Sequence, residues 1–474
     1  MKIIGGLDIG TGSCKLSLYS EEGAFLTVEA CEYEVSRNAG EHELDPETVW
    51  QAVGQVIERA AAKYDIDAIG VTSLGESFAA LDASDRPLLP AMMYTDPRGA
   101  EEYRYLEQFD LYKTVGTKPH SMYSLPKLMW VKKHRPEIYS RIKRVLLFED
   151  YIVYRLTGNA CIDYSLAART MGFDIRNKCW SPEAFRAADV DPALFSKPVP
   201  AGTVAGYSSM FGLKNAAIVN GCHDQVTAAL GAGTLAAGAA SDGMGSVECI
   251  TPVFSEVPRE KAFYDKGYSV VPYAVDGLYA CYILAFTCGT AVKWFRNTFA
   301  PGKAYSELSG GVGDEPSGLV CIPHFGGAAT PYMDETAKAM FYGVTLETSA
   351  IQLYRAILEG ANYEMLLNFE VMKEFGAEPG ELMATGGGSK SPEWLQIKAD
   401  ILNKKIISID VEEAGTVGTL MLAGTAIGAF GSLQAARDIL IRPKAEYLPR
   451  QAMHERYMEA YGIYKTLSAA KHGI

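Results

Sequence analysis

The chain has 474 residues and a mass of 51.4 kDa. A single hydrophobic core stops growing at roughly 250–300 residues, so we expect two domains. Apolar residues make up 48% and charged residues 21% of the chain, which is typical of an ordinary folded protein and excludes a disordered or fibrous one. With 44 Lys and Arg against 57 Asp and Glu, the net charge of -13 disfavours binding to nucleic acid or to an anionic membrane.

The cysteines and the N-terminus bear on the cellular compartment. The nine cysteines lie at least seven residues apart, so they form neither a CxxC metal pair nor the disulfide framework of a small secreted domain. The first ten residues, MKIIGGLDIG, lack the cationic and apolar segments of a signal peptide. No later window approaches the ~18 apolar residues of a membrane span. The sequence therefore predicts a cytoplasmic protein.

The chain begins with a predicted β-hairpin. Residues 3–9 form an apolar strand, residues 10–13 (GTGS) a polar glycine turn, and residues 14–19 a strand in which apolar and polar side chains alternate. A helix is predicted after Asp45, a suitable N-cap residue that is followed by proline and by apolar residues at helical spacing. Further alternation predicts an α/β architecture, with strands at 66–72, 145–148 and 216–220 and a helix at 351–375.

The first hairpin combines groups that suit a nucleotide phosphate and its magnesium ion. Asp8 supplies a carboxylate before the turn, the turn supplies backbone amides and hydroxyls, and Lys15 supplies a cation after it. The chain has no GxxxxGK[ST] loop, and no GxGxxG fingerprint follows a strand. Glycine-rich turns also close ordinary hairpins, so spacing alone leaves both interpretations open. Glycine clusters at 288–290 and 386–389 raise the same choice between nucleotide contact and close packing.

A second glycine turn predicts a second domain. Residues 243–246 (GMGS) are similar to residues 10–13, and each turn leads into an alternating apolar segment. The small residues at 231–240 are suited to connect two lobes. We therefore predict an N-terminal domain at 1–240 and a C-terminal domain at 241–474.

Two groups of polar residues are candidates for the chemistry. Asp224 follows the strand 216–220 and precedes a helix, which places it at the carboxyl edge of a sheet, where ligands bind in open α/β folds. Its carboxylate could accept a proton from a hydroxyl, and the alternative role is that of a helix N-cap. Glu76, Asp96 and Arg98 lie past strand ends or in a turn, where they could bind substrate hydroxyls or form a solvated surface ion pair.

Two long sequence patterns constrain many positions each. They are residues 122–134 (MYSLPKLMWVKKH) and residues 339–359 (AMFYGVTLETSAIQLYRAILE). Segments such as GCHDQVTAALGAG and ATGGGSKSPEWLQIKADIL lie between and after them. Together these segments resemble the FGGY family of carbohydrate kinases, from the first strand to about residue 430.

This resemblance implies an α/β fold of two actin-like (ribonuclease H-like) domains with a nucleotide and substrate cleft between them. It also implies an ATP-dependent kinase that uses Mg²⁺ and transfers the γ-phosphoryl group to a hydroxyl of a small ketose or polyol. The acceptor class includes ketoses of the xylulose, ribulose, fuculose or rhamnulose type and polyols from tetritol to hexitol. Family members are often dimers, so a homodimer is a candidate assembly. An ATP-switched actin-like ATPase and a sugar-binding regulator without turnover are the alternative functions.

The resemblance assigns roles to individual residues. Asp224 matches the general base of the family and Asp8 its magnesium-associated carboxylate. Glu76, Asp96 and Arg98 match positions that contact substrate hydroxyls. The expected nucleotide contacts are Thr11, Gly12, Ser13, Lys15, Gly245, Ser246, Gly289, Thr290, Gly387, Gly388 and Ser391.

Several positions depart from the family pattern or receive no role in the chemistry. Glycerol kinases of the family carry an arginine immediately before the glutamate that matches Glu76, whereas this chain has Gly75. We expect the smaller residue to leave room for a longer acceptor, which favours a ketose or polyol of four to six carbons over glycerol. Met244 precedes the second phosphate turn, where the family often has a threonine nearby. Lys127 and Trp130 are expected to serve packing and not catalysis.

Overall fold

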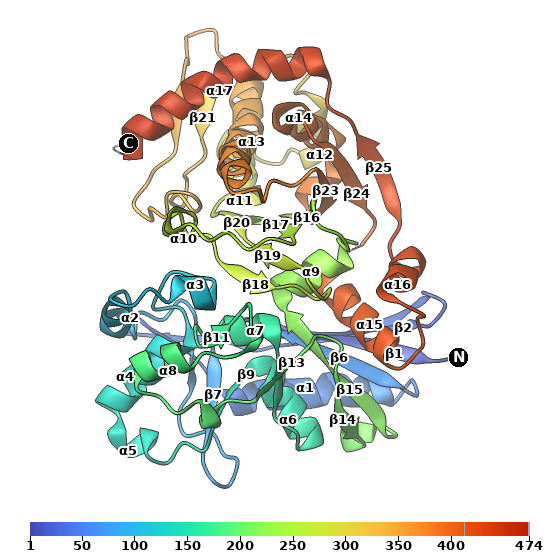
Figure 1. Cartoon of the computed structure of the whole chain (residues 1–474). Helices are drawn as coiled ribbons and strands as arrows, with labels where there is room; N and C mark the ends of the chain where they lie inside the picture. Colours follow the sequence, from blue (N-terminus) through green and yellow to red (C-terminus); the bar gives the residue numbers. More distant parts are fainter. Residues whose placement is uncertain (412, 473–474) are drawn as a thin grey trace. The chain divides into compact units, whose positions relative to one another are not determined.

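The computed structural model describes residues 1–411 and 413–472, which form two compact units (Figure 1). The first unit comprises Met1–Leu235, Ser269–Ala280 and Glu413–Ile441, and the second comprises Ala236–Tyr268, Cys281–Glu412 and Arg442–Ile474. The chain therefore passes from one unit to the other several times. The division into domains 1–240 and 241–474 stays a prediction, and two segments beyond residue 241 group with the first unit.

The first unit is built on a six-stranded sheet. Its strands, in spatial order, are β14 (Val204–Ser208), β15 (Ala216–His223), β6 (Ala68–Ser73), β1 (Ile3–Ile9), β2 (Ser13–Ser20) and β3 (Phe25–Glu32). β6 pairs in parallel with both β1 and β15, and the other three pairs are antiparallel. Ser73 at the end of β6 lies beside Ile9 and beside His223. Asp8, the loop after Ser73 and Asp224 therefore lie along one edge of the sheet, where parallel strands end together.

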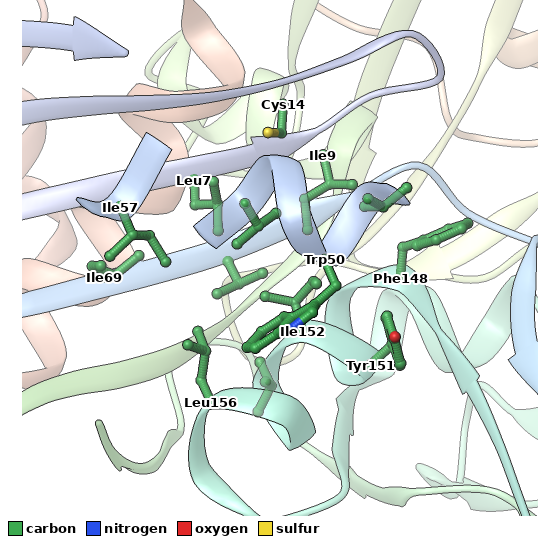
Figure 2. Close-up of a cluster of buried hydrophobic side chains, with 14 of the residues drawn as sticks. Leu7, Ile9, Cys14, Trp50, Ile57, Ile69, Phe148, Tyr151, Ile152 and Leu156 are labelled. Atoms are coloured by element: carbon green, nitrogen blue, oxygen red, sulfur yellow. The ribbon is translucent and has the colours of Figure 1, made fainter. Parts of the chain in front are cut away.

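One face of this sheet carries an apolar core. The helices packed in this unit include α1 (Pro46–Ala61), α6 (Phe148–Thr157), α9 (Asp224–Gly231) and α15 (Ala414–Ala426). Leu7 and Ile9 of β1 and Ile69 of β6 are buried among side chains of α1 and α6, including Trp50 and Ile152 (Figure 2). Alternate residues of a strand point to opposite faces, so Asp8 points away from this core.

The opposite face is rich in glycine and holds α15. A Cβ atom on Gly6 would lie 2.1 Å from the carbonyl oxygen of Thr416, so only glycine lets the backbone of α15 rest on β1. α9 crosses α15 as closely, because a Cβ atom on Gly418 would lie 1.9 Å from the carbonyl oxygen of Thr227. α15 thus fixes the position of α9, and with it Asp224, relative to β1.

The second unit repeats the local arrangement of the first. Its sheet contains β16 (Ala239–Met244), β17 (Glu248–Phe254), β20 (Ile283–Ala285), β23 (Glu381–Thr385), β24 (Lys405–Ile409) and β25 (Pro443–Tyr447). β16 forms an antiparallel hairpin with β17 and pairs in parallel with β23, as β1 pairs with β2 and β6. Helices α13 (Ala350–Glu374), α14 (Pro392–Leu402) and α17 (Gln451–His472) belong to this unit. A capping box formed by Ser349 and Gln352 starts α13.

The other elements are shorter or connect these layers. No helix within residues 1–411 and 413–472 is both long enough and apolar enough to cross a bilayer. The remaining elements are β4 (Ser36–Asn38), β5 (Glu41–Leu44), β7 (Phe78–Leu81), β8 (Ala91–Met92), α2 (Ala100–Leu106), α3 (Tyr112–Val115), α4 (Ser124–His134), α5 (Pro136–Tyr139), β9 (Arg144–Leu147), β10 (Cys161–Asp163), α7 (Tyr164–Ala168), β11 (Phe173–Asp174), β12 (Cys179–Trp180), α8 (Pro182–Ala188), η1 (Pro192–Leu194), β13 (Lys197–Val199), η2 (Met210–Gly212), α10 (Lys261–Asp265), β18 (Val270–Pro272), β19 (Tyr279–Cys281), α11 (Gly289–Phe299), α12 (Tyr305–Gly310), β21 (Val320–Ile322), β22 (Met340–Tyr342), η3 (Gly388–Lys390) and α16 (Leu433–Leu440).

Candidate active site

Asp224 is the first residue of α9, directly after β15. His223 is the N-cap residue of this helix, so the alternative role of Asp224 as the N-cap is wrong. Its Oδ1 accepts a hydrogen bond from the backbone N–H of Gln225 at 2.6 Å and lies 3.2 Å from Nε2 of His223. The side chain keeps 32% exposure, which leaves the carboxylate accessible to a ligand. Burial, and then the negative charges of Asp8 and Glu76, raise the pKa of Asp224 to about 8.

Asp8 lies on β1 opposite Lys15 of β2. Its Oδ1 is buried and accepts no hydrogen bond from any described residue, while a Cβ atom on Gly415 would lie 3.2 Å from Oδ2. Lys15 Nζ donates to Oε1 of Glu413 at 2.7 Å. Burial and the charge of Glu413 raise the pKa of Asp8 to about 6, and the charge of Lys15 opposes that shift. A buried carboxylate oxygen without a donor fits a cation.

The tip of the first hairpin is open. Thr11 and Gly12 are exposed, and a Cβ atom on Gly12 would have its nearest neighbour 3.8 Å away. The turn is held by a hydrogen bond from the Gly10 N–H to the Ser13 carbonyl at 2.9 Å. The hydroxyl of Tyr33 donates to the Gly10 carbonyl at 2.6 Å. The backbone of this turn is therefore fixed from inside while its outer side stays accessible.

Glu76 lies in the loop after β6, with its side chain only 5% exposed. Nε of Arg169 donates to Oε1 of Glu76 at 2.5 Å, and NH2 of the same guanidinium also contacts Oε1. The backbone of Glu76 has a φ of 65°, the left-handed region that few residues other than glycine adopt. Sequence reasoning missed Arg169, because its partner is far away in the chain and no local pattern connects the two.

Asp96 and Arg98 form a buried ion pair and not the solvated surface pair that was the alternative expectation. Both oxygens of Asp96 accept hydrogen bonds from Arg98, and Oδ2 also accepts from the backbone N–H of His42 at 2.7 Å. Arg98 donates further to Oε1 of Glu43 at 2.8 Å. Burial acts to raise the pKa of Asp96, but the hydrogen bonds from Arg98 and His42 outweigh it and lower that pKa.

The first long sequence pattern forms α4, and α4 supports these candidate substrate residues. The hydroxyl of Ser124 donates to the backbone carbonyl of Glu76 at 2.5 Å, and Nζ of Lys127 donates to the backbone carbonyl of Asp96 at 2.9 Å. Burial lowers the pKa of Lys127 to about 8. The guanidinium of Arg98 lies over the ring of Trp130 at 5.3 Å. The pattern therefore positions the backbone that carries the candidates.

The space beside Gly75 is filled. A Cβ atom on Gly75 would lie 2.9 Å from Cδ2 of His223 and 3.1 Å from Cγ of Arg169. The expectation that Gly75 leaves room for a longer acceptor is therefore wrong, because side chains of the protein occupy that space. The missing side chain makes space for neighbouring protein groups.

In the second unit, the glycine turn between β16 and β17 meets the segment that begins α11. The backbone N–H of Gly289 donates to the carbonyl of Gly245 at 2.9 Å. The N–H and the hydroxyl of Thr290 both donate to the carbonyl of Ser246, at 3.2 and 2.9 Å. Gly245, Ser246 and Thr290 are exposed, so the predicted second phosphate turn and the predicted nucleotide-side turn form one accessible surface.

The third glycine cluster joins the same turn. A Cβ atom on Gly388 would lie 2.8 Å from Cβ of Met244, and Met244 itself is buried. Met244 therefore places its side chain in the interior and not on the open turn. A Cβ atom on Gly387 would have open space around it. Ser391 is the N-cap of α14, and its hydroxyl accepts from the N–H of Trp394 at 3.3 Å.

A buried ion triad ties the β16–β17 hairpin to α14. Lys398 of α14 contacts Asp242 on β16 and, at 2.5 Å, Oε1 of Glu248 on β17, and all three side chains have no exposure. Burial raises the pKa of Asp242 to about 7, against the opposing charge of Lys398. One lysine thus bridges both strands that carry the turn. Sequence reasoning missed it, because a lysine within a helix is usually a surface residue.

Two further observations delimit the site. A cavity of ≈ 460 Å³ in the first unit, lined among others by Lys143, Arg144 and Ser196, contains none of the predicted site residues. Among the described residues, no group of three or more His, Cys, Asp or Glu side chains is arranged to hold a metal ion. Mg²⁺ needs no such cage, because it is usually held by one or two carboxylates together with substrate phosphates.

Comparison with known proteins identifies the family. Residues 3–231 match the N-terminal domain and residues 268–427 the C-terminal domain of the FGGY family of carbohydrate kinases. A xylulose kinase of Bacillus subtilis is 29% identical, with 98% of this chain and 97% of the relative covered. A xylulose kinase of Lactococcus lactis is 27% identical, with 98% and 96% covered. The crystal structure of a "xyloylose kinase" from Brucella ovis matches with a TM-score of 0.90 at 26% identity over 99% of both chains.

These matches confirm the predicted α/β fold of two actin-like domains. The chain therefore belongs to the FGGY family of carbohydrate kinases and is an ATP-dependent sugar kinase, as its sequence patterns predicted.

Proposed function

We propose that the chain phosphorylates a hydroxyl of an open-chain ketose of the xylulose type, with Asp224 as the general base. The observation that carries the proposal is the convergence of three carboxylates, those of Asp8, Glu76 and Asp224, along one edge of the first unit's sheet. The xylulose kinases that align with nearly the whole chain support the choice of acceptor within the broader class of ketoses and polyols.

The proposed proton acceptor is Oδ2 of Asp224. Its other oxygen, Oδ1, is held by the Gln225 N–H and lies beside His223, so the carboxylate has a fixed orientation. As the hydroxyl oxygen of the sugar bonds to the γ-phosphorus, its proton passes to Asp224 and the bond from phosphorus to the leaving oxygen of ADP breaks. The raised pKa of Asp224 suits this task, because a base with a pKa near the working pH both ionises and binds the proton.

The donor requires a cation and phosphate-binding groups. Asp8 would hold Mg²⁺, which when bound neutralises charge on the phosphate oxygens. The open hairpin tip at Thr11, Gly12 and Ser13, together with Lys15, is the proposed phosphate site of the first unit. The proposed nucleotide contacts of the second unit are Gly245, Ser246, Gly289, Thr290, Gly387, Gly388 and Ser391.

We propose that Glu76 binds the acceptor directly. Asp96 and Arg98, which form hydrogen bonds with each other, would support this part of the acceptor site. Glu76 offers a carboxylate oxygen to a sugar hydroxyl, and the loop that carries it is fixed by Ser124. A cytoplasmic location and a homodimer remain predictions from the sequence.

The test is coupled release of ADP from magnesium-ATP across a panel of ketoses, aldoses, polyols and sugar acids. We expect strong stimulation by a ketose, its loss in Asp224→Asn, and retained ADP binding in that variant. Asp65→Asn, an exposed aspartate paired with Lys214, is the control substitution and should keep full activity. Near-normal turnover of Asp224→Asn would contradict the base assignment. Sugar-independent ATPase activity would favour the ATP-switched alternative, and sugar binding without turnover would favour the regulator.

A further inference from the structure

Arg169, to which the family patterns assign no role, forms a buried ion pair with Glu76 in the first unit. The two side chains are 7% and 5% exposed. Both Nε and NH2 of Arg169 reach the same oxygen, Oε1 of Glu76. The second oxygen, Oε2, accepts no hydrogen bond within the described part of the chain. An ionised carboxylate can accept hydrogen bonds on both oxygens, so Oε2 can still bind a hydroxyl or an amide.

Arg169 is itself held by the protein around it. Its guanidinium lies over the ring of Tyr123 at 5.0 Å. The hydroxyl of Tyr123 is bound by Thr117 at 2.6 Å and Ser269 at 2.8 Å, so the ring that supports the guanidinium has a fixed orientation. The stem of Arg169 also occupies the space that a side chain at position 75 would need. The guanidinium is therefore placed by packing before any ligand arrives.

The backbone of Glu76 is placed against its preference. A φ of 65° costs energy for a residue with a Cβ atom, and such conformations persist where the surroundings impose them. Two contacts impose this one, the hydroxyl of Ser124 on the Glu76 carbonyl and the guanidinium of Arg169 on its carboxylate. Their common result is that Oε1 is turned inward to Arg169, while Oε2 is left for another donor.

A purely structural role would explain these contacts less well. A buried ion pair is weak evidence for stability, because the cost of removing two charges from water can exceed their attraction. This pair also lies beside the general base, since the charges of Glu76 and Arg169 both act on Asp224.

We infer that Arg169 is a positioning residue for acceptor recognition, which holds Oε1 of Glu76 so that Oε2 accepts a hydrogen bond from a hydroxyl of the sugar. Arg169 acts through Glu76 and does not touch the transferred phosphoryl group. The inference rests on the proposed function, because it needs a hydroxylated acceptor at this end of the first unit. It deepens that proposal by naming the pair of residues that sets affinity for the acceptor.

The test compares Arg169→Met, Arg169→Lys, Glu76→Gln and the double variant Glu76→Gln/Arg169→Met in steady-state kinetics with the best acceptor of the panel. Methionine keeps much of the stem but removes the charge. We expect Arg169→Met to raise the KM for the sugar at least tenfold, with kcat changed less than threefold and the KM for ATP changed less than twofold. Such a pattern indicates the loss of an interaction that stabilises the bound sugar equally in the ground state and in the transition state. Lysine restores the charge but not the two-pronged contact, so Arg169→Lys should fall between wild type and Arg169→Met.

The double variant separates positioning from general damage. If Arg169 acts through Glu76, removing its charge in the Glu76→Gln background should raise the KM for the sugar less than twofold further, because coupled residues are not additive. The matched control is Arg355→Met, since Arg355 pairs with Glu359 in the second unit with similarly low exposure, 3% and 1%. That control should lower the melting temperature without changing the KM for the sugar.

The outcomes distinguish the inference from the proposed function. An unchanged KM for the sugar in Arg169→Met, an equal rise in the KM for ATP, or full additivity in the double variant would overturn the inference while leaving the kinase assignment in place. Should Arg169→Met fail to fold, Arg169→Lys decides by the same criterion. If the wild-type protein phosphorylates no hydroxylated acceptor, the proposed function fails and the inference fails with it.

Discussion

Substituting Gly418 by alanine should damage both the stability of the first unit and its catalysis. The added Cβ atom would lie 1.9 Å from the carbonyl oxygen of Thr227, about 1.1 Å inside the 3.0 Å that real Cβ contacts respect. The backbone of α15 fixes the position of the Cβ atom, and the carbonyl belongs to the backbone of α9, so neither atom can rotate away. Overpacking of this kind costs about 3 kcal/mol at the upper end of the usual range, and the higher helix propensity of alanine returns ~1 kcal/mol.

The net destabilisation of about 2 kcal/mol corresponds to a fall in melting temperature of about 4–8 °C in a domain of this size. α9 must also move, and Asp224 is its first residue. A displacement of ~1 Å at a catalytic group can cost about 10²-fold in rate, so kcat should fall more than stability alone predicts.

The assay is a thermal melt together with the kcat of the best acceptor, measured well below the melting temperature. Gly462→Ala is the matched control, because Gly462 lies in α17 and an added Cβ atom would meet nothing within 4 Å beyond its chain neighbours and the adjacent helix backbone. That control should be neutral or slightly stabilising. An unchanged melting temperature and kcat in Gly418→Ala would refute the argument that the α9–α15 contact places the base.

Two further predictions concern charge. The charge of Glu76 helps to raise the pKa of Asp224, and the base works in its ionised form, so kcat/KM should fall as the pH drops through that pKa. Glu76→Gln removes this charge and should move the acid limb of the kcat/KM profile to lower pH. An acid limb that stays in place or moves to higher pH would contradict the electrostatic account. Lys398→Met leaves Asp242 and Glu248 buried without a cation, which should destabilise the second unit by about 3–5 kcal/mol in urea unfolding. A triple variant that also carries Asp242→Asn and Glu248→Gln should recover most of that loss, and an unchanged unfolding midpoint in Lys398→Met would show that the triad is dispensable.

The elements that could be predicted from the sequence have local signals. The helix α1 begins where Asp45 and Pro46 indicated, and the side chain of Asp45 accepts from the backbone N–H of Glu47. The long helix α13 spans nearly the predicted residues because its apolar spacing is regular. The three strands predicted at 66–72, 145–148 and 216–220 correspond to β6, β9 and β15, with boundaries that differ by at most three residues.

The features that escaped prediction depend on partners distant in the chain. α15, with the sequence AGTVGTLMLAGTA, carries no charged residue and has no amphipathic stripe to show which unit it joins. Its role follows only from Gly6 of β1 and from its own Gly418, which allow close packing of α15 against β1 and α9. The same holds for Arg169 and for Lys398, whose partners lie on other elements. The family patterns predicted the candidate site residues, whereas the side chains that hold these residues in place were found only in the structure.

The interrupted course of the chain through the first unit has a consequence for its biosynthesis. The sheet is complete in sequence once Leu235 has been made, yet α15 belongs to the segment Glu413–Ile441. At ~5–20 residues per second, the ribosome needs about 10–40 s to travel from Leu235 to Ile441. During that interval the glycine-lined face of β1 and β6 has no helix to cover it. The nascent protein must therefore keep an unfinished sheet from pairing wrongly until nearly the whole chain has been translated.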